Sequence, residues 1–94
     1  MTVSNNKMIE RNIELSAEFS RYLFDHPELV KTIPSDSEIV FLPEFDYDLK
    51  SFNIELGKML QASGTPVVYI KINKLRPKIL SRMEGVSVQV GTSG

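Results

Sequence analysis

The chain has 94 residues, of which 41% are hydrophobic and 24% charged, and its formal net charge is −1, so we expect one globular domain and no second core. No apolar run approaches the ~20 residues of a membrane-spanning helix, and the first residues lack the uncharged stretch of a signal peptide, which predicts a cytoplasmic location. With no cysteine and one histidine, the sequence excludes disulfides, thiolate zinc sites, a cysteine nucleophile and histidine-rich metal sites. We expect neither a metal nor a cofactor.

The charges are unevenly placed along the chain. Residues 1–70 carry 6 basic and 11 acidic side chains, whereas residues 71–94 carry 5 basic and 1 acidic. The basic segment has two interpretations: it contacts nucleic acid, or it lies against the acidic part of its own or a neighbouring chain. We favour the second, because the acidic part would repel phosphate.

The hydrophobic pattern predicts a long N-terminal helix over residues 7–25 with two adjoining apolar faces. The first face holds Met8, Leu15, Phe19, Tyr22 and Leu23. The second face holds Ile9, Ile13, Ala17 and Phe24. A helix resting on one sheet needs an apolar stripe of about 100° or slightly more. The surplus must therefore be covered by another helix of this chain or by a partner, and the pattern does not say which face is turned inward.

Apolar residues in residues 38–42 and 67–72 predict two strands, and residues 48–63 between them predict a helix. The apolar face of that helix is expected to hold Leu49, Phe52, Leu56, Met59 and Leu60. Strand, helix and strand in this order form a βαβ unit, which should be parallel with a right-handed crossover. The fold class is therefore α/β, a small βαβ unit preceded by the long helix.

Three shorter features complete the domain. Pro27 ends the long helix and predicts a short helix over residues 27–31. The alternation of valine with polar residues over 86–90 predicts an edge strand, and residues 91–94 are expected to form a disordered end.

Glu44, Asp46 and Asp48 follow the first strand at alternating positions, at the edge where parallel sheets bind ligands. They could hold a hard cation, but the glycine that a calcium loop requires is replaced by Leu49, which the helix core needs. We favour the interpretation that Asp46 or Asp48 caps the following helix.

Lys71, Lys74 and Arg76 end the second strand at the same edge. They either bind an anionic ligand or form solvated surface ion pairs, and no glycine-rich phosphate loop supports the first interpretation. His26 could act as a general base, but adjacent Asp25 is poorly placed to orient it on a helix. We expect His26 to cap or pack.

Three blocks, at residues 11–28, 40–44 and 67–77, resemble a family of small uncharacterised bacterial and archaeal proteins known as a domain of unknown function. The likeness covers about residues 8–78. It implies a compact α/β domain and no particular activity.

Two functional hypotheses follow. The favoured one is a non-enzymatic module that forms a homodimer or larger assembly, or binds a second small protein, through the N-terminal helix. Its interface is predicted to include Ile9, Ile13, Leu15, Phe19, Tyr22 and Phe24. The alternative is a small-molecule-binding or hydrolytic protein that uses Glu44, Asp46, Asp48, Lys71, Lys74 and Arg76. We expect neither nucleic acid nor a membrane as a partner.

Overall fold

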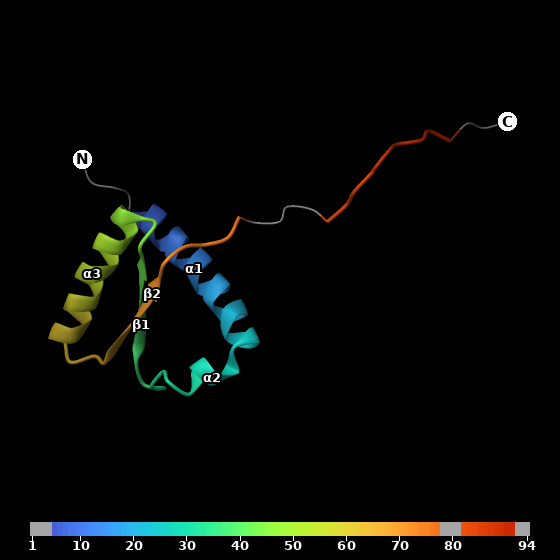
Figure 1. Ribbon diagram of the computed structural model, residues 1–94. Helices are drawn as coiled ribbons and strands as arrows, with labels where there is room; N and C mark the ends of the chain where they lie inside the picture. Colours follow the sequence, from blue (N-terminus) through green and yellow to red (C-terminus); the bar gives the residue numbers. More distant parts are fainter. Residues whose placement is uncertain (1–4, 78–81, 92–94) are drawn as a thin grey trace.

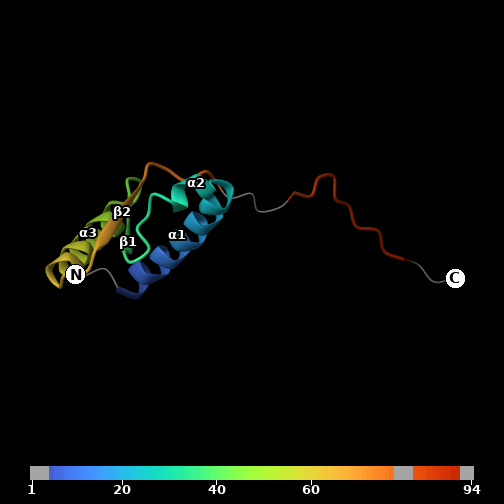
Figure 2. The same ribbon diagram turned by 90° about the horizontal axis from the view of Figure 1, so that it is seen from below.

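The structure is a computed structural model that describes residues 5–77 and 82–91. In chain order its elements are α1 (Asn5–Asp25), α2 (Pro27–Val30), β1 (Glu38–Pro43), α3 (Tyr47–Ala62) and β2 (Val67–Ile72). Figure 1 shows the two strands between α3 and α1, and the view from below in Figure 2 shows the same three layers. The predicted mixed α/β fold with a long N-terminal helix is confirmed.

The two strands form a parallel sheet, as the βαβ pattern predicts. Glu38 lies opposite Val67, and the register runs without a bulge to Pro43 opposite Ile72. Beyond the strand end, the N–H of Glu44 donates to the C=O of Ile72 over 2.9 Å, so the ladder continues into the loop before α3. Parallel strands need cover on both faces. Here α3 covers one face and α1 the other.

The structure decides which apolar face of α1 is turned inward. Met8 and Leu15 are 1% and 4% exposed and belong to the core, with Phe19 packed against them. The Phe19 ring meets the edge of the Phe41 ring with 5.6 Å between the ring centres, which fixes α1 on β1. The second face, which includes Ile13, is exposed. The surplus apolar surface of α1 is thus not covered within the described residues.

The buried line of α3 differs from the expected one. Leu49, Asn53 and Gly57 are the buried residues of this helix, four positions apart, whereas Met59 is 69% exposed and Leu56 is 39% exposed. The expected apolar face of this helix is therefore only partly buried, because Leu56 and Met59 are exposed. The small Gly57 lets the sheet approach the helix, and the ring of Tyr69 occupies the space where a larger side chain would stand.

The predicted edge strand at residues 86–90 is not formed. Residues 82–91 are exposed and belong to no strand of the sheet, which among the described residues consists of β1 and β2. In Figures 1 and 2 this segment lies away from the helices and strands. Of the predicted disordered end, Gly91 is exposed, and residues 92–94 lie outside the described residues.

Candidate functional site

The acidic loop between β1 and α3 is held by local structural contacts. Asp46 is the N-cap of α3, and its carboxylate accepts the N–H of Leu49 over 3.2 Å. The same carboxylate lies 3.4 Å from Nη1 of Arg11, so it also ties α1 to the start of α3. The expectation that an acidic residue caps this helix is confirmed for Asp46. Its oxygens are already engaged by the protein.

Glu44 is paired with a lysine in the first turns of α3. Its carboxylate lies 2.8 Å from Nζ of Lys50. The hydrogen bond from Lys50 holds the pKa of Glu44 below its usual value, and the charges of Lys50 and Lys71 act in the same direction, against a partial loss of hydration. A carboxylate with a lowered pKa is a poor general base at neutral pH.

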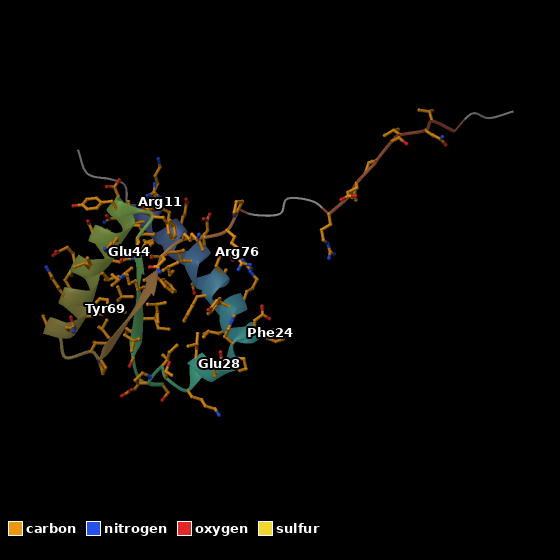
Figure 3. All side chains as sticks on the ribbon, viewed as in Figure 1. Arg11, Phe24, Glu28, Glu44, Tyr69 and Arg76 are labelled. Carbon is orange, nitrogen blue, oxygen red and sulfur yellow. The ribbon has the colours of Figure 1, made fainter. Side chains whose placement is uncertain are left out.

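Of the predicted ligand-site residues, Asp46, Lys71, Lys74 and Arg76 line one large open hollow, described below, whereas Glu44 and Asp48 do not. Asp48 is exposed in the first turn of α3, and Lys74 and Arg76 are exposed on the segment that follows β2. Figure 3 shows Arg76 away from Glu44, along the segment that leaves the sheet toward α1. Within residues 5–77 and 82–91 no three histidine, aspartate or glutamate side chains gather as a metal site would require.

His26 completes the junction between α1 and α2. Its Nδ1 lies 2.9 Å from the C=O of Tyr22, and its ring stacks on the Tyr22 ring with 4.0 Å between centres. As the donor in that bond, Nδ1 satisfies a carbonyl at the C-terminal end of α1. The side chain packs and bonds locally, as expected, and among the described residues no ion pair joins it to an acidic side chain.

The first of two apolar hollows, which we call the β1-edge groove, lies between α1 and α3. Its apolar walls are formed by Ile9, Ile13, Ile39, Val40, Phe41, Phe52 and Leu56. Asn12 and Asn53 lie between these walls. Ile9 and Ile13 are 51% and 62% exposed, so one wall of the groove is an open face of α1.

The second hollow, the β2-edge groove, lies between the other flank of α1, α2 and the free edge of β2. Its apolar lining comes from Leu15, Phe19, Tyr22, Leu29, Ile33, Ile70 and Ile72. Its volume of about 1260 Å³ exceeds the 300–1,000 Å³ typical of small-molecule pockets, and it is open to solvent along its length. A groove of this size suits a stretch of polypeptide better than a small metabolite.

The six residues predicted at an interface do not form one surface. Leu15 lies in the core and Phe19 packs against it, so neither can be the centre of an exposed patch, and we correct the prediction for both. Tyr22 lines the β2-edge groove, and Ile9 and Ile13 line the β1-edge groove. Phe24, at the end of α1, is 88% exposed and labelled in Figure 3.

Sequence reasoning missed Asn53, which is 1% exposed and bonds to both α1 and β1. The available signal was the spacing of Leu49, Asn53 and Gly57 at every fourth position, which marks one side of a helix.

A model of a protein family matches residues 7–86. The chain belongs to the family of unknown function DUF5647. The predicted resemblance to an uncharacterised family is thereby confirmed, and the family brings no activity with it. Comparison with curated proteins found no match, and neither did comparison with solved structures. Among the described residues, no helix has the length and apolar character needed to cross a membrane.

Proposed function

We propose that this DUF5647 chain is a non-enzymatic interaction module that self-associates through the outward face of α1. The observation that carries the proposal is the exposure of Ile9 and Ile13, one helical turn apart, at 51% and 62%. Exposed apolar residues scattered singly are common, but these two border an apolar groove that continues to Ile39 and Leu56. Contiguous apolar surface of this kind marks interaction sites.

The outward face of α1 has the spacing of a helix-packing seam. Ile9, Ile13, Ser16, Ser20 and Phe24 recur at every third or fourth position along the helix. Large residues at both ends with small serines between them allow a second helix to approach closely at the centre. A second copy of α1 offers the same seam, as a two-fold interface requires.

The alternative of a ligand site at the sheet rim has less support. Asp46 and Glu44 are engaged by Leu49 and Lys50, and the basic residues after β2 lie along a different segment. A binding site needs several polar groups directed at one point. Two of the carboxylates that would form it are instead bonded within the protein.

The test is the molar mass of the full chain in solution, measured by sedimentation velocity over a concentration series. We expect the wild-type chain to form a dimer or larger assembly and Ile13→Asp to shift it toward the monomer. Ile13 is exposed, so the variant should keep the circular-dichroism spectrum and melting temperature of the folded domain. The matched control is Glu14→Asp, which places an aspartate on the polar side of α1 and should leave the mass unchanged.

Two outcomes would overturn this proposal. One is a wild-type chain that is monomeric at every concentration, and the other is an Ile13→Asp variant that assembles as the wild type does. A second small protein is the other candidate occupant of this face. Its recovery with a monomeric wild-type chain, and its loss with Ile13→Asp, would replace self-association by a hetero-complex.

A further inference from the structure

The two edges of the sheet differ in whether they can accept another strand. On β1, the side-chain amide of Asn53 donates to the C=O of Phe41 over 2.9 Å, and Pro43 has no N–H to offer. The outer edge of β1 is therefore closed in its middle by α3. Side chains and prolines of this kind are the means by which proteins protect sheet edges.

The outer edge of β2 has no such protection. The N–H groups of Glu38 and Glu44 bond to the carbonyls of Pro66 and Ile72, so the even-numbered residues of this strand direct their backbone groups at β1. Because the direction alternates along a strand, Tyr69 and Lys71 direct theirs outward. Within the described residues, the sheet ends at β2.

The side chains along β2 also divide by polarity. Ile70 and Ile72 pack on the side of α1 and line the β2-edge groove. Tyr69 lies on the side of α3, where its hydroxyl donates to Gln61 over 3.0 Å, and Lys71 shares that side by alternation. A strand added beside β2 would thus need apolar side chains toward α1 and polar side chains toward α3.

Residues 86–90 have this pattern. Val86, Val88 and Val90 are 68%, 87% and 84% exposed, and they alternate with Ser87 and Gln89. We propose that residues 86–90 of a second copy pair with the free edge of β2 as a third strand. The three valines then enter the β2-edge groove, and the two polar side chains lie beside Tyr69 and Lys71.

A second copy, rather than the same chain, is indicated by the path of the backbone. Residues 73–77 leave β2 along the β2-edge groove in the direction of α1, and residues 82–91 lie beyond the body of the domain in both views. The proposal uses the opposite flank of the domain from the outward face of α1 and goes beyond the proposed function.

Disulfide trapping tests the pairing directly, because the natural chain has no cysteine. Lys71→Cys is placed in one chain and Gln89→Cys in another, and a second mixture uses Ser87→Cys to sample the neighbouring register. Every chain also carries Ile13→Asp, so that contact through α1 does not contribute. Adjacent strands lie about 4.8 Å apart, within the reach of a disulfide between facing residues.

After mild oxidation of each mixture, we expect mass spectrometry to identify a disulfide joining Cys at 71 of one chain to Cys at 89 or 87 of the other. The matched control is Val88→Cys, which points to the opposite face of the added strand and should give little product. Adding Val88→Asp to the chain that carries Gln89→Cys should abolish the crosslink, because it places a charge in the apolar groove.

The proposal is overturned if neither register crosslinks above the level of the Val88→Cys control. It is also overturned if a single chain carrying both Lys71→Cys and Gln89→Cys closes its own disulfide as a monomer, since the strand would then be supplied by the same chain. Because every chain carries Ile13→Asp, a crosslink between two chains would form without contact through the α1 face. It would therefore distinguish this interface from the one in the proposed function.

Discussion

The side-chain amides of Asn12 and Asn53 lie face to face and exchange two hydrogen bonds, of 2.9 and 2.8 Å. Asn53 is 1% exposed and also donates to the C=O of Phe41. One buried side chain therefore joins α1, β1 and α3. Among the described residues, no buried side-chain nitrogen or oxygen lacks a partner, so this polar contact within an apolar core is fully satisfied.

Replacing Asn53 by leucine should destabilise the domain. The variant leaves the C=O of Phe41 and the amide of Asn12 without partners, at a cost of about 2–3 kcal/mol in the free energy of unfolding. Urea denaturation followed by circular dichroism measures this difference. The exposed Asn73→Leu serves as control and should change stability by no more than about 0.5 kcal/mol. If Asn53→Leu unfolds at the wild-type midpoint, the contact contributes nothing.

Asp46→Ala should lower the free energy of unfolding by about 1 kcal/mol, because the N–H of Leu49 loses its cap. Asp46→Asn should keep most of that stability, since asparagine caps as well as aspartate and the half-exposed pair with Arg11 contributes little. Thermal melts of the two variants provide the comparison. Equal losses in both would assign the effect to the charge and not to the cap.

Gly57→Ala should destabilise the wild-type domain although alanine favours a helix. A Cβ at this position would stand 2.5 Å from Oη and 2.8 Å from Cε1 of Tyr69, so the tyrosine would have to leave its hydrogen bond to Gln61. In a Tyr69→Val background the clash is gone, and the same substitution should stabilise by up to about 1 kcal/mol. Denaturant titration of the four proteins tests the change of sign. The same sign in both backgrounds would contradict the close approach.

Lys50→Met should raise the pKa of Glu44, because it removes the hydrogen bond and the nearest positive charge. The side-chain carboxyl carbon of Glu44, followed by NMR across acidic pH, reports this pKa directly. Lys50→Arg keeps the charge and should keep the pKa low. Since the folded-state pKa of Glu44 lies below the unfolded one, its contribution to stability is present above the unfolded value and disappears as pH falls through the folded value.

The elements of the fold could be predicted because each has a local signal. Pro27 ends α1, Asp46 begins α3, and runs of apolar residues mark both strands. The two strands are expected to pair in parallel because the connection between them contains a helix. Such a connection is a crossover and not a hairpin turn. In these regions the local preferences and the tertiary structure agree.

What sequence reasoning could not place depends on contacts between elements. Asparagine in a helix is ordinarily a surface residue, and Asn53 is buried only because Asn12 and Phe41 offer it partners far along the chain. The two apolar faces of α1 look alike in composition, so which one packs depends on the shape of the sheet surface. The pattern at residues 86–90 gave the period of a strand but contained nothing about which chain would pair with it.

The closed edge of β1 limits how far copies of this protein can add to one another. A sheet that is open on both sides can extend without end, as fibrils do. Here Asn53 and Pro43 interrupt one side, so β2 is the edge of the two-stranded sheet that stays open. Two copies joined at β2 would keep β1 at one end of each sheet, and that end stays interrupted. Further strand pairing at that end is blocked, and an Asn53 substitution that reopens it would act on the solubility of the chain as well as on its stability.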